Sequence, residues 1–112
     1  MKSFISLLLL LSAFSVGAET IQEGRWTTAA EVTSVEIHDN SIYRVVTNTT
    51  DNTSAVCASE NGTYWWPATD ALAKEYYSTA LAAFASGKRI SVVYKDDCNI
   101  ASKRLTHIMV NH

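Results

Sequence analysis

The longest periodic stretch of the chain runs from Ala68 to Ser86, where apolar positions repeat with the period of a helix. Thr69 or Asp70 is a suitable N-cap, and Gly87 is a suitable residue to end the helix. The opposite arc carries polar and small residues, so the pattern predicts one amphipathic helix over Ala68–Ser86. The predicted buried face is one broad arc: Leu72, Ala73, Tyr76, Tyr77, Ala80, Leu81, Ala83 and Phe84.

Alternating stretches precede this helix. Trp26–His38 alternates apolar and polar side chains with the period of a strand. Ile42–Thr47 is rich in residues that favour strands, and the turn residues Asp39–Ser41 predict a hairpin between the two. Ser54–Ala58 is predicted as a third short strand. The aromatic run that follows, immediately before the helix, is expected to cover the start of the helix.

Strand patterns also follow the helix. Arg89–Lys95 alternates as a fourth strand, Asp96–Asn99 is predicted as a turn, and Leu105–Val110 is predicted as the fifth strand. The element order predicts a mostly β, α+β fold. We expect a small five-stranded OB-like barrel with one long helix between strands 3 and 4.

The first 18 residues have the pattern of a secretory signal peptide. Lys2 gives a positive head, Phe4–Phe14 is apolar, and small residues end at Ala18, after which cleavage is expected. A transmembrane anchor is the other interpretation, but the apolar run is shorter than the roughly 20 residues that a span needs. We therefore expect a signal peptide over 1–18, a single OB-like domain over 19–112, and a secreted or periplasmic protein without a membrane span.

The two cysteines, Cys57 and Cys98, form an even count in a chain that is expected to be exported, which favours a disulfide. Free thiols or a metal site are the alternatives, although the two residues lack the paired spacing of a zinc site. In the chain-entropy model, closing this loop would stabilise the fold by about 4 kcal/mol.

Charge and motifs narrow the class of function. The chain carries 9 basic and 11 acidic residues without a basic patch, so nucleic acid is not expected as a partner. The three histidines, His38, His107 and His112, belong to no catalytic or metal-binding motif. We therefore expect a protein that is not an enzyme and needs no cofactor or metal.

Aromatic residues outside the helix suggest a binding role instead. Tryptophan and tyrosine rings stack on the apolar faces of sugars, although small cores also need aromatic residues. We name Trp65 as a candidate ligand contact. The aromatic residues in question are Trp26, Tyr43, Tyr64, Trp65, Trp66 and Tyr94.

Small residues on the polar arc of the helix have two interpretations. They allow another copy of the chain to approach closely, or they are present because alanine favours helices. These residues are Ala71, Ser78, Ala82 and Ala85.

The order of short motifs over Ile42–Cys98 is similar to that of a known group of proteins. The order is Ile42-Tyr43, then Ser54-Ala55-Val56-Cys57, then a tryptophan before an aromatic-rich helix that ends Phe84-Ala85-Ser86-Gly87, then Val93-Tyr94. This order resembles the receptor-binding B subunits of the subtilase cytotoxin and typhoid toxin group, which are relatives of the pertussis-type B subunits. It is also similar to small exported bacterial OB-fold proteins of unknown function, which share the helix end at Leu81–Lys88.

The resemblance implies a glycan-binding module, with a pentamer as the assembly. In the family a tyrosine on the strand after the helix lines the sugar pocket, and Tyr94 has the matching place. A first-strand serine contributes in the family, and this chain has Thr27 and Thr28 nearby instead. The alternative is an exported interaction or inhibitor protein of the bacterial envelope that has no glycan ligand.

Overall fold

The computed structural model describes residues 24–49, 57, 62–99 and 101–112. The predicted signal peptide over 1–18 lies outside these ranges. The described elements are five strands and one helix: β1 (Ala30–His38), β2 (Ile42–Thr47), β3 (Thr63–Pro67), α2 (Ala73–Ser86), β4 (Arg89–Asn99) and β5 (Ser102–Asn111).

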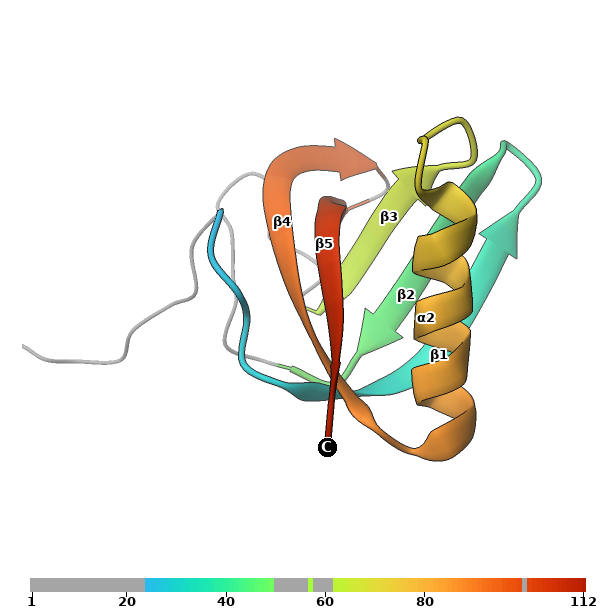
Figure 1. Ribbon diagram of the computed structural model, residues 1–112. Helices are drawn as coiled ribbons and strands as arrows, with labels where there is room; N and C mark the ends of the chain where they lie inside the picture. The colour runs from blue at the N-terminus through green and yellow to red at the C-terminus, as the bar shows by residue number, and fades with distance from the viewer. Residues whose placement is uncertain (1–23, 50–56, 58–61, 100) are drawn as a thin grey trace, which may run out of the picture.

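The strands form a closed, barrel-like ring in the order β1-β2-β3-β5-β4. All neighbouring pairs are antiparallel except β3 and β5, which run parallel. The helix α2 lies between strands 3 and 4 in the chain and packs mainly against β1 and β5 (Figure 1). The prediction of a mostly β, OB-like fold with one helix between strands 3 and 4 is confirmed.

The third strand differs from the predicted one. Of Ser54–Ala58, only Cys57 lies within the described residues, and the described third strand is Thr63–Pro67. It pairs with β2 along its whole length, from Val46 opposite Thr63 to Ile42 opposite Pro67. The aromatic run before the helix is therefore a strand of the ring, and its Trp66 also packs against the start of α2, as expected.

The segment before β1 also differs from the prediction. We expected a strand from Trp26, but β1 begins at Ala30. The backbone N–H of Val92 donates to the Thr27 hydroxyl at 3.0 Å, and the N–H of Thr27 donates to the Val92 carbonyl at 2.8 Å. Because a side-chain oxygen takes the place of a backbone acceptor, the segment lies along β4 without continuing a regular ladder.

The helix begins one turn later than predicted. The chain first makes turns, in which the N–H of Asp70 donates to Pro67 O and the N–H of Ala73 donates to Asp70 O, both at 3.0 Å. The Asp70 carboxylate accepts the N–H of Leu72 at 3.1 Å. Asp70 thus caps this preceding turn, while the helix itself starts at Ala73 without a side-chain cap. Gly87 ends the helix in the left-handed conformation, as predicted.

The buried stripe of α2 is narrower than the predicted arc. Only Ala73, Tyr76, Ala80 and Ala83 are buried. Leu72, Leu81 and Phe84 are about half exposed, at 50%, 42% and 47%. A single helix that packs mainly against β1 and β5 contacts the ring along one stripe, so its flanking apolar residues stay in solvent.

The core fills the ring and the space beneath α2. Its largest fully buried side chains are Trp66, Tyr64 and Tyr94, joined by valine, isoleucine and leucine from the inner faces of the strands. Trp66 contacts Tyr76 edge-to-face at 5.7 Å, and Tyr43 stacks on Tyr77 at 5.1 Å. Aromatic pairs of this kind contribute beyond the area that they bury.

The last part of β4 holds the disulfide. Cys57 and Cys98 are bonded, as predicted. The residues Asp96–Asn99, which we predicted as a turn, belong to β4, which pairs with β5 through Asn99 opposite Ser102 after an irregularity that begins at Lys95. The disulfide fits an exported protein. In the described part of the chain, no helix has the length and apolar character to cross a membrane.

Candidate functional site

Two of the residues predicted to contact a ligand have buried rings. Tyr94 is 2% exposed and lies against Tyr64, with ring centroids 6.0 Å apart. Trp65 is 9% exposed, donates its indole N–H to Asp97 O at 2.7 Å and lies 5.2 Å below the Arg104 guanidinium. Both rings are thus held by packing, and a ligand contact by either one stays a prediction.

The two predicted threonines lie beside β4. Thr27 is buried and its hydroxyl accepts the N–H of Val92, whereas Thr28 is exposed. Trp65 lies on β3, so the structure does not bring all four predicted contacts to one surface. Thr28 follows Trp26 by two positions in the chain, and the Trp26 indole is exposed.

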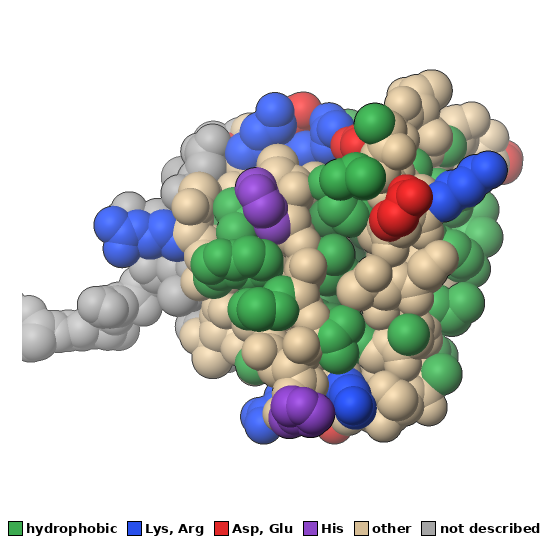
Figure 2. All heavy atoms as spheres, in the orientation of Figure 1, with side chains coloured by type: hydrophobic (Ala, Val, Ile, Leu, Met, Phe, Trp, Pro, Cys, Tyr) green, Lys and Arg blue, Asp and Glu red, His purple; other side chains and the backbone are tan. Residues whose placement is uncertain are grey.

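We call Trp26, His107 and Met109 the Trp26 face. Trp26 is 45% exposed, and its ring meets the His107 imidazole edge-on, with centroids 5.9 Å apart. Met109 is two residues beyond His107 on β5, hence on the same side of the strand, and is 41% exposed. Figure 2 shows a histidine beside exposed hydrophobic side chains over β4 and β5. The surface combines an indole, an imidazole and a thioether.

The backbone beneath Trp26 is held in place. Two hydrogen bonds join Thr27 to Val92, and the N–H of Gly24 donates to Tyr94 O at 3.0 Å. The indole is therefore attached to a segment that is fixed to β4 on both of its sides. A ligand that stacks on this ring meets a surface that is already ordered, which lowers the entropic cost of binding.

The hydrogen bonds of Thr106 determine the tautomer of His107. The Thr106 hydroxyl has one proton and donates it to Val93 O at 3.0 Å. The same oxygen lies 3.0 Å from Nδ1 of His107, so Nδ1 must carry the proton and donate. Neutral His107 consequently presents Nε2 as an acceptor beside Trp26.

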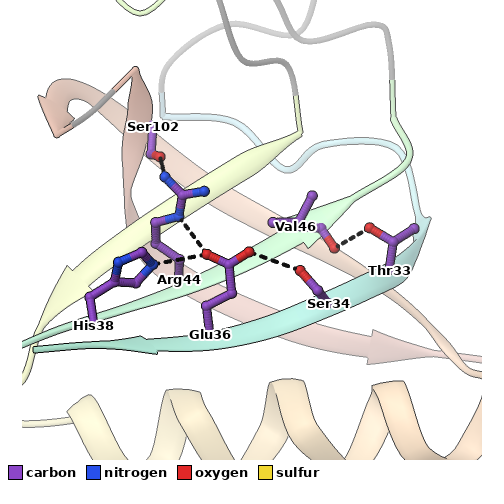
Figure 3. A network of polar contacts seen from close by, with 7 residues as sticks. All are labelled: Thr33, Ser34, Glu36, His38, Arg44, Val46 and Ser102. Atoms are coloured by element: carbon purple, nitrogen blue, oxygen red, sulfur yellow. Dashed lines mark hydrogen bonds and ion pairs between the residues drawn. The ribbon is translucent and has the colours of Figure 1, made fainter.

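A second polar cluster lies on the outer side of β1 and β2, and we call it the Glu36 network: Ser34, Glu36, His38, Arg44 and Ser102. Figure 3 shows the Glu36 carboxylate between its three donors. His38 Nε2 lies 2.9 Å and Arg44 Nε 3.1 Å from one carboxylate oxygen, and the Ser34 hydroxyl lies 3.1 Å from the other. Arg44 also donates to the Ser102 hydroxyl at 3.2 Å.

These donors set the charge state of Glu36. The hydrogen bond from His38 has the largest effect in lowering the pKa of Glu36 below its ordinary value, and the Arg44 charge and the Ser34 hydroxyl add to it. Burial acts in the opposite direction but does not outweigh them. A carboxylate that is held ionised by three donors is suited to fixing its neighbours and poorly suited to taking a proton.

The cluster continues to the neighbouring strands through Arg44, which faces Trp65 across β2 and β3. Beyond Trp65, Arg104 on β5 forms an ion pair of 2.8 Å with Asp70. The backbone N–H of Leu72, and then Arg104, lower the pKa of Asp70. These pairs join the loop before α2 to the sheet.

Sequence reasoning named Trp26 as a candidate aromatic and placed His107 on the last strand, but nothing in the sequence joined the two. In the described part of the chain, no three His, Cys, Asp or Glu side chains gather in a group that could hold a metal ion.

Comparisons with known proteins add no assignment. No protein-family model matches the chain, and no curated protein matches it either.

Proposed function

We propose that this chain is a secreted or periplasmic, non-enzymatic binding domain and that its Trp26 face binds carbohydrate. The observation that carries the proposal is the exposed, fixed indole of Trp26 beside the Nε2 acceptor of His107. The C–H face of a sugar ring stacks on an indole, while its hydroxyls need acceptors and donors close by. Thr28 adds an exposed hydroxyl two residues from the ring.

This proposal places the ligand contact at the Trp26 face and not at Tyr94. The resemblance to toxin B subunits implied Tyr94, whose ring is buried, whereas Thr27 and Thr28 lie next to Trp26 in the chain. A glycan-binding role therefore rests on the Trp26 face and not on the Tyr94 ring. Thr27 acts here by fixing the backbone, since its hydroxyl accepts the N–H of Val92.

A glycan array that is probed with the oxidised mature chain tests the proposal, followed by titration calorimetry on each hit. Trp26→Ala is expected to weaken binding at least tenfold, and His107→Ala severalfold. Leu72→Ala is the matched control, because Leu72 is equally exposed but lies at the start of α2. An array without hits, or hits that Trp26→Ala leaves unchanged, would overturn the proposal.

The second candidate is an exported interaction protein with no glycan ligand. Leu81 and Phe84, one helical turn apart on α2, are 42% and 47% exposed, and such a pair can anchor a protein partner. Capture from an envelope extract that is lost in Leu81→Ser and Phe84→Ser, but kept in Trp26→Ala, would favour this function over carbohydrate binding.

Assembly is a separate proposal. The small residues Ala71, Ser78, Ala82 and Ala85 are exposed in the described chain, so copies of α2 have room to approach one another. We propose a homo-oligomer through this face, with a pentamer as in the B subunits that the sequence resembles. Sedimentation velocity of the wild type and of Ser78→Arg tests it: a monomeric wild type would rule the assembly out.

A further inference from the structure

A small cleft lies where the β1–β2 turn meets the loop that enters α2, on a different part of the molecule from the Trp26 face. Its volume is about 250 Å³, and we call it the turn cleft. Figure 1 shows the turn and the loop next to each other, where Ile42 pairs with Pro67. The cleft is lined by Ile37, His38, Asp39, Ser41, Ile42, Tyr43 and Ala68.

Hydrogen bonds and ring stacking hold the walls of the cleft. The N–H of Ser41 donates to His38 O at 3.2 Å, and Ser41 O accepts the N–H of Ala68 at 2.8 Å. Tyr43 stacks on Tyr77 from α2 at 5.1 Å. The space is therefore present before any ligand arrives, and its occupant loses little to ordering the protein.

The size of the cleft limits the occupant. Since a water molecule occupies about 30 Å³ in the liquid, the space holds a single ring or a short chain and not an extended polymer. Ile37, Ile42 and Tyr43 provide apolar contact, and Ile37 is 64% exposed. A ligand with an apolar body would cover this surface.

The charges along the cleft select the polar end of the ligand. Asp39 is the one carboxylate in the lining, which contains no lysine or arginine. Among the described residues, none of the ion pairs includes Asp39. Arg44, on the neighbouring strand, is already bonded to Glu36 and Ser102.

The Glu36 network also fixes the second polar group of the cleft. Glu36 is ionised and can only accept, so His38 Nε2 carries a proton and donates it at 2.9 Å. In the neutral imidazole, Nδ1 is then an acceptor. The lining thus combines a carboxylate, an imidazole and an apolar wall, which together complement an ammonium group on a small apolar body.

We propose that the turn cleft binds small amphipathic primary amines, with the ammonium at Asp39 and the apolar body against Ile42 and Tyr43. The turn cleft shares no residue with the Trp26 face, so either binding proposal can be disproved without affecting the other. Asp39 and Ile37 are exposed and do not belong to the core, so variants at both positions are expected to fold.

The test uses the oxidised mature chain, labelled with ¹⁵N, at pH 8. Benzylamine is titrated and followed by amide shifts, with benzyl alcohol as the neutral analogue of the same shape. We expect saturable shifts centred on residues 37–43 and 68, and at least fivefold tighter binding of the amine. Asp39→Asn should remove that preference, and Ile37→Ser should weaken both compounds alike.

Asp97→Asn is the matched control, because it removes an exposed carboxylate that does not line the cleft and should leave both affinities unchanged. Equal affinity for benzylamine and benzyl alcohol would overturn the proposal. So would an amine preference that survives in Asp39→Asn, or shifts that centre on residues outside the cleft.

Discussion

The indole nitrogen of Trp66 donates a hydrogen bond of 3.0 Å to the backbone oxygen of Ala73. Trp66 lies on β3 and is completely buried, while Ala73 is the first residue of α2. One side chain thus joins the third strand to the start of the helix. It contributes both a hydrogen bond and the largest buried apolar surface in the core.

Trp66→Phe is expected to lower the free energy of unfolding by about 2–3 kcal/mol. The lost hydrogen bond accounts for about 1 kcal/mol, and the missing apolar atoms with the space they leave account for about 1–2 kcal/mol. Urea denaturation, followed by circular dichroism, measures the change. Trp26→Phe is the control, since Trp26 is 45% exposed and its replacement should cost less than about 0.5 kcal/mol. Equal losses in both variants would contradict this account of Trp66.

The same run of residues explains what the sequence could not predict about the fold. A strand that is covered on both sides has no alternation of apolar and polar residues. Residues 63–66 are all buried, two of them inside the ring and Trp65 beneath Arg104 on the outside. Pattern reasoning therefore recognised β1, whose residues alternate, and β2, whose residues favour strands, and missed β3.

The candidate site was predictable only in part. The sequence shows that residue 26 is a tryptophan, but it does not show that the ring is exposed. The exposure of Trp26 depends on how the segment before β1 runs along β4. His107 reaches it because β5 pairs with β4 in a register that shifts between Val93 and Tyr94. Such a shift moves every later side chain relative to its partner. The alternation of residues in the sequence does not predict this register shift.

Gly62 and Gly87 allow the effects of backbone strain and close contact to be separated. Both have positive φ, at 78° and 72°. A Cβ at Gly62 would lie 2.8 Å from Thr47 O, whereas a Cβ at Gly87 meets nothing within 4 Å. Gly87→Ala should therefore cost about 1 kcal/mol, from the left-handed backbone alone. Gly62→Ala should cost clearly more, because the Thr47 backbone has to move.

Thermal or urea unfolding of the two alanine variants, side by side, gives this comparison. The expected order is wild type, then Gly87→Ala, then Gly62→Ala. If Gly62→Ala were as stable as Gly87→Ala, the approach of Gly62 to β2 would not contribute to the cost.

The disulfide between Cys57 and Cys98 closes a loop with a sequence separation of 41 residues. Loop closure of this length restricts the unfolded chain by about 4 kcal/mol. The double variant Cys57→Ala/Cys98→Ala should lose a large share of that amount, and a reducing agent should lower the urea midpoint of the wild type but not of the variant. A wild type that is insensitive to reductant would show that the bond adds little to the fold.

The lowered pKa of Glu36 leads to a prediction of how the stability of the fold changes with pH. Its pKa in the folded protein is lowered, chiefly by the hydrogen bond from His38. The unfolded chain therefore binds a proton at a higher pH than the folded chain does. The stabilisation is fully present above the ordinary glutamate range near about 4.3, and it is lost as the pH falls through the lower, folded value. Asp70, whose pKa is also lowered, acts in the same direction.

Glu36→Gln removes this contribution, so the fall in stability between pH 7 and pH 3.5 should be smaller in the variant than in the wild type. Asp70→Asn should reduce it further in the double variant, because the two carboxylates belong to separate ion pairs. Asp97→Asn is the control, because Asp97 takes part in none of the ion pairs found among the described residues. Urea midpoints across the pH series measure these slopes. Parallel curves for the wild type and Glu36→Gln would mean that solvent screens the network and that His38, Arg44 and Ser34 position the carboxylate without stabilising the fold.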